Sequence, residues 1–161
     1  MTPGSLAIQA ARPQDAEAIS VLLLSLANRC TLYPDMRGAE RFLASFAPDA
    51  LRAVIAAPAY RYLAGWIDGS LAGVIALRDN AHLFHLFVAE RFQGRKLASA
   101  LWAEAKAVAL AAGNPGRFTV NSSVAAVPVY RAFGFRPNGD HMAADGIVYL
   151  PMLYTGEATA A

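Results

Sequence analysis

Three apolar, β-prone segments follow one another between residues 60 and 88, and only short turn sequences separate them. The segments are Tyr60–Ile67, Leu71–Leu77 and Ala81–Val88. The sequence DGS between the first two is a tight hairpin signal, and RDN turns the chain again before the third. Because connections this short join antiparallel neighbours, the stretch predicts an antiparallel meander of three strands.

A helical pattern begins soon after the third strand and runs from Arg95 to about Ala112. Its apolar positions follow helical spacing: they are Leu97, Ala100, Leu101, Ala105, Val108 and Ala109. The sequence GNPG ends the pattern, Arg117–Val120 reads as a strand, and NSS reads as the turn after it. A strand, a helix and a strand in this order predict a β-α-β unit with parallel strands and a right-handed connection.

The remaining segments add strands and helices on both sides of this unit. Leu6–Ala11 reads as a strand, and Asp15 is the expected N-cap of a helix. The buried stripe of that helix is Ile19, Leu22, Leu23 and Leu26. Further helices are expected over Pro48–Ala56 and Val127–Phe133, and further strands from Phe135 and over Ile147–Tyr154. This order predicts an α+β fold, with one domain over residues 1–154 and a flexible tail over residues 155–161.

Composition excludes several classes of protein. Of the 161 residues, 56% are hydrophobic and 16% charged, which is typical of a globular chain. The longest apolar segment, Ile19–Ala27, is far shorter than the roughly 20 residues of a membrane span. The N-terminus lacks a signal-peptide pattern and Cys30 is the single cysteine, so we expect a cytoplasmic protein. Net charge is +2 with scattered basic residues, which argues against a nucleic-acid surface. Exposed edge strands make a homodimer possible.

The sequence FVAERFQGRKLASALW, residues 87–102, places a short turn between a strand and a helix. A helix N-terminus has unpaired N–H groups and a partial positive charge, so it attracts anions. The turn contains a single glycine, Gly94, together with Arg95 and Lys96. The pattern therefore predicts a site for a phosphate group.

This turn and a second motif together resemble the GNAT superfamily of N-acetyltransferases. The first family motif is Gln or Arg, two residues, Gly, one residue, then Gly or Ala; Gln93 and Ala98 match its ends, and Lys96 stands at the middle glycine. The second motif lies in SSVAAVPVYRAFGF, and its matching residues are Ser123, Ala126, Tyr130, Gly134 and Phe135. The two halves occur in the family's order and at about its usual separation.

The resemblance implies a mixed, mostly antiparallel twisted sheet flanked by helices, with a central β-α-β unit that binds acetyl-CoA. The backbone amides from Gly94 to Ser99 would then hold the pyrophosphate, with cationic charge from Arg95 and Lys96. Lys96 suits this role only if its backbone is already helical there; the alternative is a tolerated surface residue. The expected acetyl-CoA residues are Phe87, Val88, Gln93, Gly94, Arg95, Lys96, Leu97, Ala98, Ser99, Asn121 and Ser123. Asn121 and Ser123 are alternatively part of a polar turn that caps the next helix.

Tyr130 is the expected general acid, because the family uses a tyrosine at this position to protonate the departing thiolate. A phenol with a pKa near ~10 suits that task. The alternative is a tyrosine that packs its short helix onto the sheet. For the general base, His82 resembles the first of two strand histidines in the arylalkylamine N-acetyltransferases, with Phe84 in place of the second. Counting in steps of two from Val88 puts His82 on the same face as Val88 and His85 on the other; Glu90 is the rival base.

The segment between residues 29 and 46 is expected to cover the acceptor, with Tyr33, Phe42 and Phe46 as candidate walls; the alternative is that these three residues belong to the core. It holds no acidic cluster, which favours an apolar or aromatic amine. We therefore expect transfer of an acetyl group from acetyl-CoA to a primary amine of a small molecule or protein by direct attack. The competing hypothesis is a non-enzymatic acyl-CoA-binding module, which Lys96 favours and Tyr130 argues against. One cysteine and three scattered histidines give no metal-ligand spacing.

Overall fold

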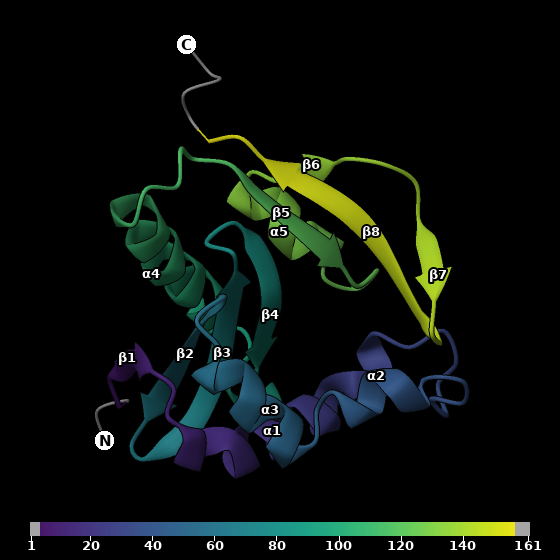
Figure 1. Ribbon diagram of the computed structural model, residues 1–161, viewed down its shortest axis with the longest axis horizontal. Coiled ribbons are helices and arrows are strands. Elements are labelled where there is room, and N and C mark those ends of the chain that lie inside the picture. Colours follow the sequence, from purple (N-terminus) through teal and green to yellow (C-terminus); the bar gives the residue numbers. More distant parts are fainter. Residues whose placement is uncertain (1–3, 157–161) are drawn as a thin grey trace.

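A twisted sheet of eight strands forms the centre of the protein in the computed structural model, which describes residues 4–156 (Figure 1). The strands are β1 (Leu6–Ala10), β2 (Tyr60–Ile67), β3 (Ser70–Arg78), β4 (His82–Val88), β5 (Phe118–Ser122), β6 (Arg136–Pro137), β7 (Met142–Ala144) and β8 (Ile147–Tyr154). Their order is β1-β2-β3-β4-β5-β8-β6, and β7 pairs with β8. Only the β4–β5 pair is parallel among the pairs of described strands. The mixed, mostly antiparallel sheet and the parallel β-α-β unit are confirmed.

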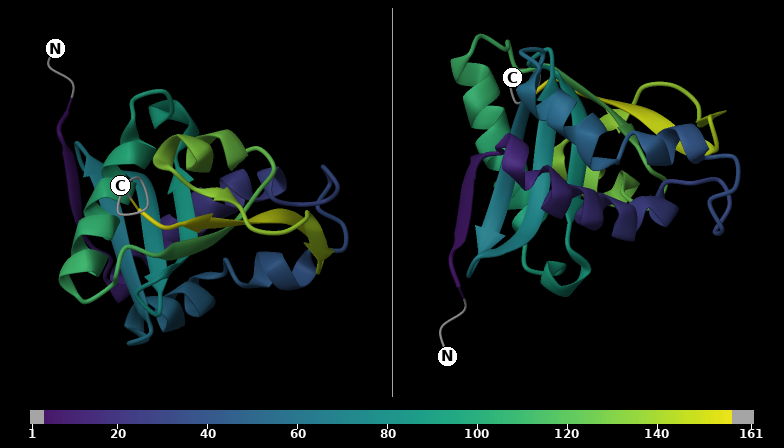
Figure 2. Two further views of the ribbon diagram at one scale, coloured as in Figure 1. Left: turned by 90° about the horizontal axis from the view of Figure 1, so that it is seen from above. Right: turned by 60° about the horizontal axis from the view of Figure 1, so that its bottom comes forward.

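Helices cover both faces of the sheet (Figure 2). They are α1 (Ala16–Leu26), α2 (Glu40–Ala44), α3 (Pro48–Ala56), α4 (Leu97–Ala111) and α5 (Val127–Phe133). Leu23 of α1 and Leu51 of α3 are buried in a core with the inner side chains of β2 and β3. Leu101 of α4 and Tyr130 of α5 belong to a second core on the opposite face. Each core buries apolar side chains from both helices and sheet, so the two layers hold the sheet in place.

Strand β4 contains a bulge that changes the direction of its side chains. Ala76 of β3 pairs with His85, whereas the next residue, Leu77, pairs with Leu83, so Phe84 is the extra residue. Leu83 lies in the α4 core, and His85 contacts Phe46 on the α1–α3 side, although the two are two residues apart. The expected alternation along this strand is therefore wrong: the bulge lets His82 and His85 line the same cavity.

Strands β4 and β5 pair over a short length only. Their paired positions are His82 with Thr119 and Leu83 with Val120. Beyond Leu83 the two strands form no ladder, and the last residues of β4 line cavities instead. The parallel pair therefore separates at the end of β4 that leads into α4.

Several element boundaries differ from the expected ones. Helix α4 begins at Leu97 and not at Arg95, because Lys96 has a left-handed backbone. Asp15 forms no side-chain cap on α1; its carboxylate accepts a hydrogen bond from the Arg12 N–H at 2.8 Å and so closes a short 3-10 turn ahead of the helix. Strand β5 continues to Ser122, so the first two residues of the expected NSS turn, Asn121 and Ser122, belong to the strand.

The ends of the chain are described in part. Of the expected flexible tail over residues 155–161, the residues from 157 onward lie outside the described part of the structure. No helix between residues 4 and 156 is long and apolar enough to cross a membrane.

Candidate active site

The turn between β4 and α4 is held against the end of its strand. A 3-10 turn over Glu90–Phe92 follows β4, and the Gln93 side-chain amide donates a hydrogen bond to the carbonyl oxygen of Val88 at 3.0 Å. Gly94 has a φ of +81°, and a Cβ added there would meet nothing within 4 Å. The turn is therefore anchored by Gln93 and open around Gly94.

Lys96 adopts the left-handed conformation at the N-cap of α4, with φ +62° and ψ +25°. The condition set for its cationic role, a backbone already helical at this residue, is therefore not met. A left-handed position favours glycine, because a Cβ there crowds the backbone. This explains in physical terms why the family motif has glycine at this position.

The first turn of α4 presents free backbone donors. Within the described chain, the N–H groups of Leu97, Ala98 and Ser99 form no hydrogen bond, since no earlier helical turn supplies a carbonyl. Lys96 is exposed beside them and adds positive charge. Together these groups form a surface suited to an anion such as a pyrophosphate.

A cavity of about 530 Å³ extends from this turn along the end of β4 to α5. Nine of the residues expected to contact acetyl-CoA line it: Phe87, Val88, Gln93, Gly94, Lys96, Leu97, Ala98, Ser99 and Ser123. Arg95 is not in its wall, and its guanidinium carbon lies 5.5 Å from the ring centre of Phe92. Asn121 lines a neighbouring cavity instead.

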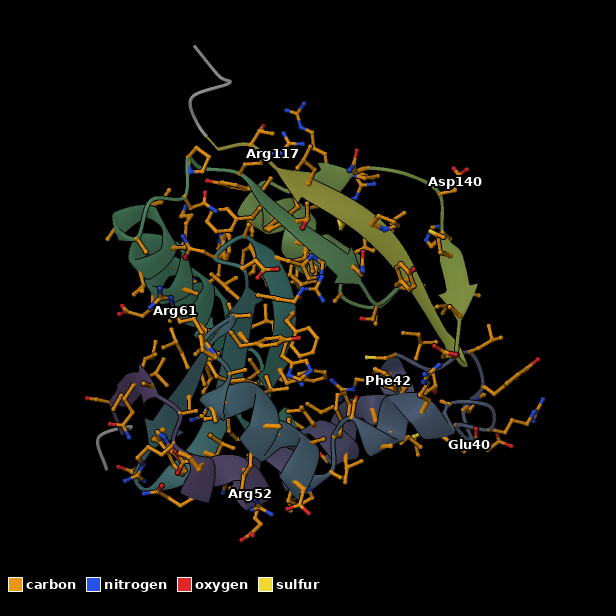
Figure 3. The ribbon with its side chains drawn as sticks, in the orientation of Figure 1. Glu40, Phe42, Arg52, Arg61, Arg117 and Asp140 are labelled. Carbon is orange, nitrogen blue, oxygen red and sulfur yellow. The ribbon has the colours of Figure 1, made fainter. Side chains whose placement is uncertain are left out.

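That second cavity, of about 380 Å³, lies between β4, β5, β8 and the segment of α2. Phe42 and Phe46 line it, and Figure 3 labels Phe42 on α2. Tyr33 is in neither wall; its ring lies 3.8 Å from the guanidinium carbon of Arg37 and is partly exposed. Two of the three candidate acceptor residues are therefore brought together.

The two cavities share part of their walls. The common residues are Cys30, Leu86, Phe87, Ser123, Ala126 and Tyr130. Tyr130 is 5% exposed, and burial, with a further contribution from Cys30, raises the pKa of its phenol above the usual value. Burial also raises the pKa of the Cys30 thiol to about 11, against an opposing effect of Arg29. A protonated phenol and a protonated thiol therefore stand where the cavities meet.

His82 and His85 are both neutral side chains in the second cavity. His82 Nδ1 lies 2.8 Å from Thr119 Oγ1, and burial together with the nearby Arg78 lowers its pKa. His85 Nδ1 lies 2.8 Å from the hydroxyl oxygen of Tyr62, and burial lowers the pKa of His85 to about 3. The rival base Glu90 has an exposed side chain, lines neither cavity and faces Arg29 at 4.0 Å.

Four residues of the site were missed at the level of sequence: Arg29, Cys30, Arg78 and Tyr149. Arg29 and Cys30 follow α1 directly, in a segment without a clear periodic pattern. Arg78 ends a strand and reads as an ordinary turn residue. Cys30 carried one usable signal, since a lone cysteine stands out in composition, but nothing in the sequence placed it near Tyr130.

The comparisons with known proteins agree with this geometry. Residues 28–155 match the family model described as an acetyltransferase (GNAT) domain. A search of curated proteins finds no match.

Solved structures with the same fold include several N-acetyltransferases. The PaiA N-acetyltransferase from Thermoplasma acidophilum, in complex with coenzyme A, has a TM-score of 0.74 and 16% identity over 94% of this chain and 99% of its own. A GCN5-related N-acetyltransferase from Rhodopseudomonas palustris has a TM-score of 0.81 and 18% identity over 96% and 98%. The ribosomal-protein-S18-alanine N-acetyltransferase from Escherichia coli has a TM-score of 0.69 and 15% identity over 94% of each chain.

The family match covers most of the chain, including both motifs, the turn before α4 and the tyrosine between the cavities. The solved structures share its fold over almost their whole length. The chain therefore belongs to the GNAT acetyltransferase family.

Proposed function

We propose that this protein transfers the acetyl group of acetyl-CoA to a primary amine of a small molecule or peptide by direct attack of the amine on the thioester. The observation that carries the proposal is the buried Tyr130, which stands in the wall that both cavities share. One cavity begins at an anion-binding helix terminus and the other is lined by neutral histidines and aromatic rings. The shared wall is thus the place where a donor and an acceptor would meet.

The first cavity offers donor groups suited to acetyl-CoA. The free N–H groups at the start of α4 would hold the pyrophosphate, and Lys96 would lie beside it. The pantetheine arm would run along Phe87 and Val88, which pair with β3 and not with β5. Bound in this way, acetyl-CoA supplies a thioester with an electrophilic carbonyl carbon next to Tyr130.

Tyr130 would donate its phenolic proton to the sulfur as the carbon–sulfur bond breaks. Its raised pKa keeps the proton in place at neutral pH, so the phenol is in the form that a general acid needs. The proton of the attacking amine would leave along the second cavity, where His82 is the proposed proton acceptor. In the tautomer whose Nδ1–H donates to Thr119 Oγ1, the Nε2 atom of His82 carries the free lone pair, and the lowered pKa of His82 keeps the ring neutral.

The second cavity favours an apolar or aromatic acceptor. Its wall contains the rings of Phe42, Phe46, Phe84, Phe87 and Tyr149. Burial of an apolar acceptor body against such rings stabilises the complex in proportion to the area removed from water. The proposed acceptor class includes peptide amines as well as small amines, because the same fold occurs in an enzyme named for acetylating a protein alanine.

The test is the variant Tyr130→Phe, assayed by release of the CoA thiol with a panel of primary amines. We expect kcat to fall by about 100-fold or more, because a positioned proton donor is lost with little change of shape. The gain in Tm caused by acetyl-CoA should stay the same, since a ligand that binds only the folded state stabilises it to the same extent in both proteins.

Tyr154→Phe is the matched control. Tyr154 is a buried tyrosine of the same core, its hydroxyl accepts a hydrogen bond from Lys106, and it lines neither cavity. Its variant should keep the wild-type kcat. Acetyl-CoA stabilisation without acetylation of any amine would refute the proposal and support an acyl-CoA-binding module.

A further inference from the structure

The second cavity has an uneven charge distribution. Among the described residues of its wall, Arg78 is the one with an ionised side chain, and no aspartate or glutamate is present. His82 and His85 are neutral for the reasons given above. An amine acceptor is a cation in water, yet this cavity offers it a cation and no anion. The charge of Arg78 therefore has to serve another part of the acceptor.

Arg78 is well placed to bind an anionic group. It is the last residue of β3 and the cross-strand neighbour of His82, at the end of β4 farthest from Val88. Its side chain is 43% exposed, and its nearest acidic neighbour is the exposed Asp79, with Oδ2 at 3.9 Å from Nε. No hydrogen bond in the described chain uses the Arg78 guanidinium, so its planar pair of donors is available to a ligand.

The separation of Arg78 from the reacting centre sets the size of the ligand. From His82, opposite Arg78, to Phe87, in the shared wall, a strand advances about 15 Å at roughly 3.3 Å per residue. The bulge at Phe84 shortens this path, and Arg78 lies in the wall of the cavity that extends along it. The distance that remains between the guanidinium and the reacting centre corresponds to one aromatic ring with a short linker. An anion attached directly to the carbon that carries the amine would lie too close to Tyr130 to reach the guanidinium.

We propose that the acceptor is a primary amine with a carboxylate at the opposite end of an aromatic or apolar body, and that Arg78 pairs with this carboxylate. The inference rests on the proposed acetyl transfer and names the acceptor class of the same site. A guanidinium binds a carboxylate through two parallel hydrogen bonds, which fixes the orientation of the ligand as well as its affinity. The amine then points toward Tyr130, and the aromatic body lies among Phe42, Phe46 and Phe84. A diamine would place a second cation against Arg78 and bind poorly.

Arg78 also lowers the pKa of His82, so a variant at Arg78 changes both the contact with the carboxylate and the pKa of His82. Removal of the guanidinium takes away the repulsion that lowers the pKa of His82. An experiment with one substrate would mix this effect with loss of the carboxylate contact. Two substrates of equal shape separate them, because a change at His82 affects both substrates alike.

The test compares para-(aminomethyl)benzoate with the neutral para-(aminomethyl)benzamide and with the dicationic para-xylylenediamine. For the wild type, kcat/KM should be about tenfold higher for the benzoate than for the benzamide and lowest for the diamine, as expected for one partly exposed charge-assisted contact. In Arg78→Gln the ratio of benzoate to benzamide should fall to near one, mainly through KM of the benzoate.

Arg61→Gln is the matched control, because it removes one guanidinium from the neighbouring strand β2. Arg61 lines neither cavity, and Figure 3 shows it beside α4, away from α2. This variant should keep the wild-type ratio. Equal use of benzoate and benzamide by the wild type, or an unchanged ratio in Arg78→Gln, would overturn the carboxylate site while leaving acetyl transfer intact.

Calorimetric binding to the CoA-bound protein gives a readout that does not depend on turnover. The benzoate should bind about tenfold tighter than the benzamide to the wild type and equally to Arg78→Gln. Selective binding with no acetyl transfer to any of the three amines would refute the proposed function and keep the anion site. Equal binding of the two compounds would refute the anion site whatever the activity.

Discussion

Replacement of Lys96 by glycine and, separately, by alanine tests the geometry of the anion-binding turn. The backbone at this residue is left-handed, with φ +62° and ψ +25°. A left-handed conformation costs a residue with a Cβ about 1–2 kcal/mol, and glycine avoids this cost. Glycine in turn loses about 0.5–1 kcal/mol through the greater freedom of the unfolded chain. Lys96→Gly should therefore raise the free energy of unfolding by about 0.5–1 kcal/mol.

Lys96→Ala separates the backbone effect from the side chain. Alanine has the same left-handed cost as lysine, and the Lys96 side chain is exposed, so this variant should have nearly the wild-type stability. Urea unfolding without acetyl-CoA, followed by the fluorescence of Trp66 and Trp102, measures both differences. A glycine variant no more stable than the alanine variant would contradict a left-handed backbone at this position.

Acetyl-CoA binding by the same two variants measures the role of the lysine charge. Both lose the ammonium group, so wild type should bind several-fold tighter than the alanine variant at low salt and by a smaller factor at high salt, where screening is strong. Any further difference in acetyl-CoA affinity between the glycine and alanine variants is caused by the Cβ at this position. Equal binding by wild type and Lys96→Ala at low salt would mean that backbone amides alone hold the pyrophosphate.

Two other predictions concern stability. Because burial lowers the pKa of His85 to about 3, the unfolded chain binds a proton between about pH 6.5 and 3 that the folded protein does not, and stability falls as the pH falls through this window. His85→Gln should flatten this decline by up to ~1.4 kcal/mol per pH unit, measured by urea unfolding at several pH values; parallel pH curves would show that His85 titrates normally. Gly146→Ala should lower stability by about 2–3 kcal/mol, because φ there is +76° and a Cβ would overlap the backbone of Gly38 and Ala39. Gly69→Ala, with φ +78° and open space around its Cβ, should lose only about 1 kcal/mol, and equal losses in the two variants would rule out that packing contact.

The strand meander and the β-α-β unit were predictable because their signals are local. The hairpin at Asp68 and Gly69 depends on a turn that these residues favour by themselves, and the helical spacing of α4 follows from the chain geometry. The first motif predicted a turn with free N–H groups for the same reason, since the N–H groups at a helix start are free whatever surrounds them; binding of a phosphate there stays a prediction. The expectation that Tyr130 acts as the general acid came from the resemblance of its motif to the GNAT family and stays a prediction.

The direction of the β4 side chains was not predictable in this way. A bulge depends on how the neighbouring strand pairs, and here Leu77 and Ala76 of β3 decide that Phe84 is the extra residue. A strand read by itself has a period of two, which placed His82 and His85 on different faces. The pairing with β3 brings both histidines to one cavity.

The sequence by itself determined the family and most of the order of elements, since these depend on neighbours along the chain. Helix α2 and strand β7 were not expected, and α4 begins two residues later than expected. The tertiary structure alone decided the composition of the second cavity. Its wall combines Cys30, Tyr149 and, from the adjacent strands β3 and β4, Arg78 and His85, so it draws on three regions far apart in the sequence. The left-handed backbone of Lys96 was also a tertiary result, because lysine does not favour that conformation and the anchored turn and helix impose it. Long-range pairing and packing fix such features, and no local pattern of residue types records them.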